Sequence, residues 1–97
     1  MQRNLNCSVV IRTLNEADRL RLTLTSLACQ SRIPEVVVVN DGSEDHTAEV
    51  IAGFRGRLPL KEIHHDSPHG RSAASNAGAV AAEGDVIILL DGDTPAN

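Results

Sequence analysis

An uninterrupted apolar run, Val86 to Leu90, leads directly into the acidic sequence Asp91-Gly92-Asp93. Three of its five residues are β-branched, and such a run predicts a strand buried on both faces at the centre of a parallel sheet. Asp91 and Asp93 are two residues apart, so in an extended chain both side chains leave on one side, with Cα atoms roughly 6.5 Å apart. Paired carboxylates of this kind suit one hard divalent cation. We therefore expect a site for a divalent metal and phosphate groups at the C-terminal end of this strand.

Length and composition limit the size of the protein and the class of its partners. The 97 residues include a single aromatic residue, Phe54, and carry a net charge of -4. A chain of this length forms one domain, here residues 1–97, with a modest core. The lack of aromatic stacking platforms and the negative charge argue against a nucleic-acid partner. An anionic ligand must therefore be bound by local amides, by an arginine or by a metal.

Cys7 and Cys29 fall in a predicted strand and a predicted helix, without CxxC spacing. We expect buried free thiols in a reducing compartment, and a disulfide between them is the lesser alternative. The N-terminus lacks the apolar stretch of a signal peptide, and no apolar run approaches the roughly 18 residues of a membrane span. We therefore expect no membrane span in these residues and a cytoplasmic location. If the chain is part of a longer protein, that location could be the cytoplasmic face of a membrane.

The chain ends three residues after Thr94, directly beyond its most chemically distinctive loop. We therefore expect it to be the N-terminal part of a longer protein, with a truncated sheet. A truncated sheet exposes an apolar face, through which the fragment could form a homodimer.

Strand-like and helix-like patterns alternate along the whole chain. Runs rich in β-branched residues are separated by segments in which apolar residues recur with the helical period. The order β-α-β-α-β-α-β implies an α/β fold with a doubly wound, mainly parallel sheet of the Rossmann type, whose ligands bind beyond the C-terminal strand ends. We expect strands at 7–11, 35–40, 58–64 and 86–90, the third nearer an edge, and helices at 17–29, 48–54 and 71–82.

The ends and inner faces of the helices can also be predicted. Asn15 is expected to cap the first helix, and Ser43 or Asp45 the second. Gly84 is expected to end the third helix as its C-cap. The residues expected to face the sheet are Ala48, Val50, Ile51 and Phe54 in the second helix and Ala73, Ala74, Ala77, Val80 and Ala81 in the third.

Polar residues gather at three of the predicted strand ends, at 12–16, 40–43 and 91–94. In the predicted topology, all three loops can face one crevice.

The turn after the first strand has no glycine, which excludes the GxGxxG dinucleotide fingerprint, and no GxxxxGK[ST] loop occurs. Asp-Gly-Asp-Thr departs from the phosphatase pattern DxDx[TV], because its threonine directly follows the second aspartate. The histidine-rich segment 64–69 is interpreted as a solvated loop rather than a zinc site.

Four segments carry motifs that occur in a fixed order: residues 8–17, 37–47, 70–78 and 91–93. The second contains NDGSEDHT, the third reads GRSAASNAG and the last reads DGD. In this order they resemble the opening strand and turn, the DDGSxDxT segment, the glycine-to-asparagine segment and the DxD motif of the family 2 glycosyltransferases of the GT-A fold. The resemblance covers nearly the whole chain.

The resemblance implies a glycosyltransferase with a nucleotide-sugar donor, UDP- or GDP-linked, and a divalent cation, Mg²⁺ or Mn²⁺; it does not identify the acceptor. This chain would be the N-terminal, nucleotide-sugar-binding part. By the resemblance, Thr13 and Glu16 line the nucleotide pocket, and Asp41 hydrogen-bonds the base. Arg71 would lie near the nucleotide or diphosphate. Asp91 would contact the ribose or the hydration shell of the metal, and Asp93, with Asp91, would form the metal site. Asp41 has a second, compatible role in organising the turn before the second helix.

Two departures and several alternatives accompany this interpretation. Asn40 replaces the first aspartate of DDGS, and Ser75 stands where many members carry arginine. The catalytic base and acceptor recognition are expected downstream, so the fragment alone should show little or no transfer. The alternative is a non-catalytic nucleotide-binding or partner-binding module of the same fold. Thr13 and Glu16 could equally serve only the first helix, and Arg71 could equally be an ordinary exposed residue at the start of the third helix.

Overall fold

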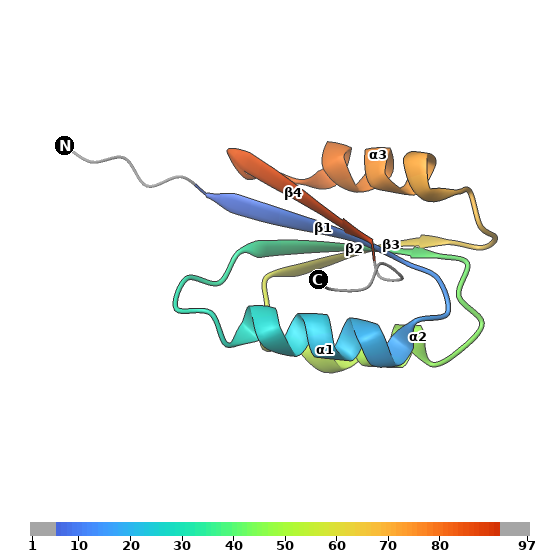
Figure 1. Cartoon of the computed structure of the whole chain (residues 1–97), viewed down its shortest axis with the longest axis horizontal. Helices are drawn as coiled ribbons and strands as arrows, with labels where there is room; N and C mark the ends of the chain where they lie inside the picture. Colours follow the sequence, from blue (N-terminus) through green and yellow to red (C-terminus); the bar gives the residue numbers. More distant parts are fainter. Residues whose placement is uncertain (1–5, 92–97) are drawn as a thin grey trace.

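The structure, a computed structural model, describes residues 6–91 of the 97. This part of the chain forms a four-stranded parallel sheet with helices on both faces, as Figure 1 shows. The strand order β3-β2-β1-β4 is the doubly wound arrangement that was predicted. No described helix is long and apolar enough to cross a membrane. The elements are β1 (Cys7–Thr13), α1 (Ala17–Ala28), β2 (Glu35–Asp41), α2 (Thr47–Phe54), β3 (Leu60–His65), α3 (Arg71–Ala81) and β4 (Val86–Asp91).

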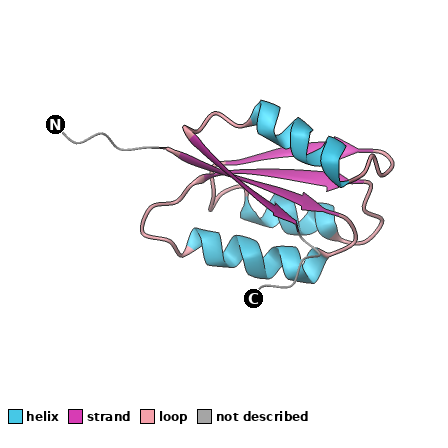
Figure 2. Ribbon diagram, turned by 45° about the horizontal axis from the view of Figure 1, so that its top comes forward, coloured by secondary structure: helices cyan, strands magenta, loops and turns pink. Residues whose placement is uncertain are grey.

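The two faces of the sheet have separate cores of small aliphatic residues. α1 and α2 lie on one face and α3 on the other, which Figures 1 and 2 show from two directions. Because side chains alternate along a strand, the central valines are divided between the two cores. β1 and β2 are therefore buried on both sides. Val9, Ile11, Val36 and Val38 pack with α1 and α2, whereas Val10, Val37 and Val39 pack with Ala74 of α3.

β4 is an edge strand, contrary to the prediction of a doubly buried strand at the centre of the sheet. Within the described residues it pairs only with β1, and its five apolar residues are 40–55% exposed. α3 packs mainly on β1 and β2, so the described helices leave β4 largely uncovered. The apolar run identified a strand correctly, but it carried no information about the neighbours of that strand. β3, predicted to lie near an edge, forms the opposite edge.

α3 approaches the sheet along a different stripe of residues from the predicted one. Gly78 is buried, whereas Val80, predicted to face the sheet, is 87% exposed. An ideal Cβ on Gly78 would lie 2.2 Å from Val10 Cγ1, so only glycine permits this approach. The prediction failed because a hydrophobicity pattern gives weight to valine and none to glycine. The predicted C-cap is also wrong, because Ala82 occupies that position in an extended conformation, two residues before Gly84.

Two other helix residues differ from the prediction. Ala48 of α2 and Ala73 of α3, predicted to face the sheet, are exposed. In the first turn of α2 the buried residue is Thr47, whose hydroxyl donates a hydrogen bond to Asp45. The remaining residues predicted to face inward from α2 are buried: Val50, Ile51 and Phe54.

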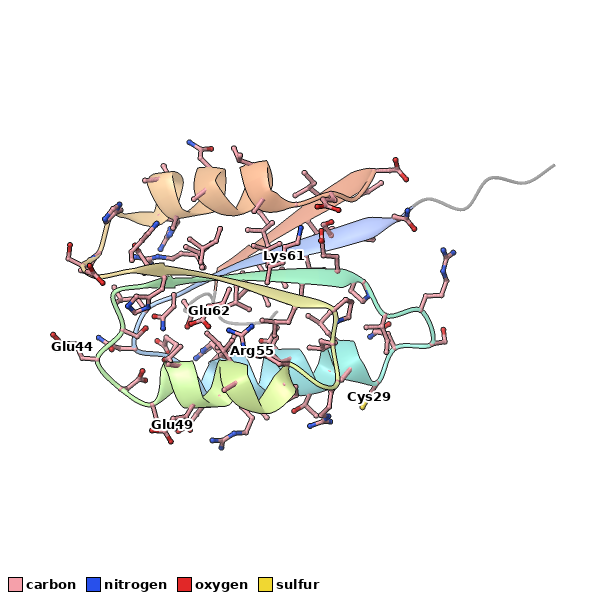
Figure 3. All side chains as sticks on the ribbon, turned by 180° about the vertical axis from the view of Figure 1, so that it is seen from behind. Cys29, Glu44, Glu49, Arg55, Lys61 and Glu62 are labelled. Atoms are coloured by element: carbon pink, nitrogen blue, oxygen red, sulfur yellow. The ribbon has the colours of Figure 1, made fainter. Side chains whose placement is uncertain are left out.

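The two cysteines are free, as predicted, but neither is fully buried. Cys7 is partly buried in β1, whereas Cys29, labelled in Figure 3, is exposed. Cys29 was predicted to lie within a helix, but α1 ends at Ala28, one residue before it.

Replacement of Gly78 by alanine is expected to destabilise the fold, although alanine normally favours a helix. The new methyl group would overlap Val10, and overpacking of this kind costs about 1–3 kcal/mol. Gly53→Ala in α2 is the matched control, because nothing lies within 4 Å of the position of its Cβ. Its gain in helix propensity should stabilise the protein by about 0.5–1 kcal/mol. Urea denaturation followed by circular dichroism measures both, and equal effects would contradict the close approach of α3.

Candidate functional site

The C-terminal ends of three adjacent strands carry a row of polar side chains. Arg12 is near the end of β1, Asp41 ends β2 and His65 ends β3. Asp41 is the register partner of His65, and Arg12 forms an ion pair with Asp41 from the neighbouring strand. By strand alternation from Val39, this row faces α3. The strand ends therefore meet at one edge of the sheet, as the predicted topology requires.

Asp41 is fully buried, with an exposed fraction of 0%, and its carboxylate accepts five hydrogen bonds. Oδ2 accepts from Nε and Nη2 of Arg12 at 3.3 and 3.1 Å and from the amide of Gly70 at 3.1 Å. Oδ1 accepts from Nδ1 of His65 at 2.8 Å and from the amide of His69 at 2.9 Å. Donors from β1, from β3 and from the start of α3 therefore converge on one carboxylate.

These contacts keep Asp41 ionised. Burial by itself would raise the pKa of the carboxyl group. The hydrogen bonds from the His69 amide, His65, Arg12 and the Gly70 amide outweigh burial and hold the pKa of Asp41 well below its usual range. The charge is balanced by Arg12, whose side chain is only 10% exposed. Arg12 and Asp41 therefore form a buried ion pair without net charge.

The loops that follow β1 and β2 are joined by reciprocal hydrogen bonds. The amide of Asn15 donates to Ser43 Oγ at 2.9 Å, and the amide of Glu44 donates to Asn15 Oδ1 at 2.7 Å. These three residues are termed the loop clasp. Asn15 has a φ of 54° and does not cap α1, so its predicted role as an N-cap is wrong. The two loops are thereby fixed to each other at the same edge of the sheet as Asp41.

The N-terminus of α1 is instead capped from the loop after β2. Asp45 Oδ2 accepts the amide of Ala17 at 3.2 Å, and Oδ1 accepts the amide of Thr47 at 3.0 Å. Burial raises the pKa of Asp45, but the hydrogen bonds from Thr47 and Ala17 outweigh it and lower the pKa overall. The N-cap residue of α2 is His46, so the prediction that Ser43 or Asp45 occupies that position is wrong. Asp45, one residue earlier, nevertheless accepts the first amide of α2 and also holds the start of α1.

Thr13 and Glu16, predicted to line a nucleotide pocket, lie at the end of β1 and the start of α1. Thr13 is fully buried, and in the sheet it is the register partner of Asn40 in β2. Its Oγ1 has no hydrogen-bond partner within residues 6–91. Glu16 is the N-cap residue of α1, is partly exposed and forms a 3.8 Å ion pair with Arg19. The hydroxyl of Thr13 is therefore a buried polar group that the described fold does not satisfy.

The remaining predicted site residues are Arg71, Asp91 and Asp93. Arg71 is the exposed first residue of α3 and directly follows Gly70, whose amide bonds Asp41. Asp91 ends β4, and its Cα is the register partner of the Cα of Arg12. Asp93 lies outside the described residues. Arg71 and the backbone of Asp91 are therefore at the same edge of the sheet as the buried ion pair.

Arg12 and His65 are site residues that the sequence did not reveal. The interpretation of the histidine-rich segment as a solvated loop is wrong for His65, which ends β3 and has a side chain only 15% exposed. Its ring stacks on that of His69, with centroids 4.1 Å apart. Arg12 belongs to β1 rather than to the predicted turn. Strand register could have identified both, because residues at the ends of adjacent parallel strands are neighbours.

The similarity to known proteins agrees with this arrangement of strand ends. The family model described as Glycosyl transferase family 2 matches residues 8–95, which is most of the chain. The chain belongs to glycosyl transferase family 2. The predicted resemblance to that family is thereby confirmed, as is the α/β fold with its parallel sheet.

Several members of glycosyl transferase family 2 are similar over nearly the whole chain. The poly-β-1,6-N-acetyl-D-glucosamine synthase of Staphylococcus epidermidis is 32% identical over 88 residues, which cover 90% of this chain and 21% of that protein. The structure of Staphylococcus aureus TarS in complex with UDP-GlcNAc is 31% identical, with a TM-score of 0.86, and the match covers 92% of this chain and 27% of that one.

A third relative has both a nucleotide sugar and a metal in its structure. It is a mannosyltransferase from Pyrobaculum calidifontis in complex with GDP-Man and Mn²⁺, 26% identical, with a TM-score of 0.77. The match covers 97% of this chain and 30% of that one. The chain therefore spans less than a third of the length of each of these three relatives.

Asp45→Ala is expected to destabilise the fold by about 1–2 kcal/mol, because it removes the acceptor for the first amide of both α1 and α2. Glu44→Ala is the matched control. Its side chain points away from the protein in Figure 3, and only its backbone amide takes part in the loop clasp. Urea denaturation should show a change within about 0.5 kcal/mol for the control. A loss as large as that of Asp45→Ala would contradict the capping role.

The free energy of unfolding is expected to fall as the pH drops below about 4, near the pKa of aspartate in an unfolded chain. Asp41 and Asp45 have lowered pKa values in the folded state, so the unfolded chain binds protons more readily. Their contribution is complete above that pH and is lost progressively towards the lower, folded-state pKa. Urea midpoints at pH 6 and pH 3 test this. An equal or higher midpoint at pH 3 would disprove it.

Proposed function

We propose that this chain is the donor-binding part of a glycosyltransferase, which transfers a sugar from a UDP- or GDP-linked donor to an acceptor. The observation that carries the proposal is the meeting of the β1, β2 and β4 ends at one edge of the sheet, within the span of the family match. Ligands of open parallel sheets bind beyond this edge. The complexes of TarS with UDP-GlcNAc and of the mannosyltransferase with GDP-Man support the choice of donor.

Thr13, Glu16 and Arg71 are the proposed donor contacts among the described residues. Thr13 ends β1 at this edge of the sheet, and its hydroxyl has unused hydrogen-bonding capacity within the described fold. Glu16 lies three residues further along, at the start of α1. Arg71 lies in the first turn of α3, where the guanidinium group and the positive end of the helix dipole both favour a diphosphate.

Asp91 and Asp93 are the proposed ligands of the cation. Carboxylate oxygens fit a hard divalent ion such as Mg²⁺ or Mn²⁺, and the donor's phosphates commonly complete such a site. Within residues 6–91, no group of three or more histidine, cysteine or acidic side chains could hold a metal ion by itself. Arg12, the register partner of Asp91, already has Asp41 as its ion-pair partner. The bound cation would stabilise the negative charge that develops on the diphosphate.

Isothermal titration of the purified chain with UDP and GDP, with and without Mn²⁺, tests the proposal. We expect binding of one of them that strengthens with Mn²⁺, and a loss of at least about tenfold in affinity in Asp93→Ala, which removes a direct metal ligand. Asp85→Ala is the matched control, because Asp85 precedes β4 at the opposite end of the strand. Binding that needs no metal and survives Asp93→Ala would contradict the proposed cation site.

A further inference from the structure

Arg12 holds one oxygen of the Asp41 carboxylate and leaves the other to different donors. Nε and Nη2 of Arg12 both donate to Oδ2, at 3.3 and 3.1 Å. Oδ1 receives neither of these bonds and accepts instead from Nδ1 of His65 and from the amide of His69. The guanidinium group therefore fixes the carboxylate through Oδ2, whereas the donors to Oδ1 come from β3 and from the loop that follows it.

The sequence resemblance implies that Asp41 hydrogen-bonds the base of the donor. None of its surface is exposed, so a base can reach the carboxylate only where a protein donor gives way. Arg12 is poorly suited to give way, because its side chain is 10% exposed and would be left as a buried charge without a partner. His65 is held in β3 and is also largely buried. The amide of His69 belongs to the exposed loop 66–70, which Figure 1 shows at the same end of the sheet as the loops after β1 and β2. The base would therefore replace this amide on Oδ1.

A base that donates an N–H needs an ionised acceptor. Uracil and guanine each present a ring N–H beside a carbonyl group, whereas cytosine and adenine present an unprotonated ring nitrogen at the corresponding position. A carboxylate can only accept, but a protonated carboxyl group uses one oxygen as a donor. Burial by itself would raise the pKa of Asp41, and the hydrogen bonds from the His69 amide, His65 and Arg12 lower it. Loss of Arg12 would therefore make Asp41 easier to protonate.

We propose that Arg12 is a positioning residue for base recognition: it fixes the carboxylate of Asp41 so that Oδ1 can accept the N–H of the base in place of the His69 amide. This inference rests on the proposed function for the identity of the ligand. Arg12 acts through Asp41 and not by contact with the donor. Its loss should therefore impair the choice between bases, and not only the strength of binding.

The test is the ratio of affinities for UDP and CDP, and for GDP and ADP, each titrated with Mn²⁺ into the purified chain. The two ligands of a pair share the ribose and the diphosphate, so the ratio reports on the base. We expect the wild type to prefer UDP or GDP at least about tenfold over its partner, comparable to one hydrogen bond to a charged group. Arg12→Met should lose most of that preference. Arg12→Lys keeps the charge without the two-pronged contact and should recover part of it.

A pH series separates positioning from a purely structural role. The charged and titratable residues that contact Asp41 or lie at the same edge of the sheet are Arg12, His65, His69, Arg71 and Asp91. All except Arg12 are present in both proteins, so a difference between the wild type and Arg12→Met is due to Arg12. Between pH 8 and pH 5 the preference of Arg12→Met should fall further as Asp41 is protonated, whereas that of the wild type should stay within about threefold.

A control variant and a measurement on the wild type keep the test decisive. Arg21→Met is the matched control, because Arg21 is an exposed residue of α1 whose ion-pair partner is Asp18, and it should leave the preference unchanged. If Arg12→Met does not fold, hydrogen exchange by NMR decides. When the nucleotide binds, Nε–H of Arg12 should stay protected, and the amide of His69 should exchange at least about tenfold faster. Loss of protection at Arg12, or greater protection at His69, would overturn the proposal.

Failure of the proposed function gives a different result from failure of this inference. If the wild type binds neither UDP nor GDP with Mn²⁺, the proposed donor site is wrong and the role of Arg12 falls with it. If the wild type binds a nucleotide without discriminating within its pair, only this inference is overturned. The same holds if Arg12→Met discriminates as well as the wild type at both pH values, or weakens both ligands of a pair equally.

Discussion

Burial of a carboxylate costs several kcal/mol unless its oxygens are satisfied, and Asp41 is satisfied only when three parts of the chain meet around it. Arg12 comes from β1, His65 from β3, and two amides from the turn before α3. The alignment of the strands and the start of α3 are therefore imposed by one charged group. The same contacts lie at the edge of the sheet where we propose that the ligand binds. The fold and the proposed site therefore depend on one interaction.

α3 is held at both ends by polar contacts and in the middle by packing. At the C-terminal end of the helix is Lys61, which lies on the α3 face of the sheet (Figure 3). Its ammonium group donates to the carbonyl oxygen of Ala81 at 3.1 Å and also pairs with Glu83 and Glu35. Glu83, and then Glu35, raise the pKa of Lys61. In between, Gly78 brings the helix backbone against Val10. A helix whose apolar residues are nearly all alanine is therefore positioned by its ends and by the absence of a side chain at Gly78.

The order and type of the elements could be predicted because hydrophobic periodicity is a local property of the sequence. The caps and the site could be predicted only in part. Arg12 and His65 matter because of strand register, and Gly78 because of a contact between α3 and β1, neither of which is local. The exposure of β4 likewise depends on what lies beside it and not on its own residues. Thr13 and Arg71 lie at the expected edge, and the metal roles of Asp91 and Asp93 stay predictions.

The loop clasp couples the lengths of two loops that are nearly thirty residues apart in the sequence. Each of its hydrogen bonds joins a residue of the β1–α1 turn to a residue of the β2–α2 loop. An insertion or deletion between the strand end and the loop clasp, in either loop, would shift Asn15 relative to Ser43 and Glu44. Both hydrogen bonds would then be lost. A graft of the NDGSEDHT segment into a related scaffold would therefore have to bring Asn15 and its left-handed backbone with it.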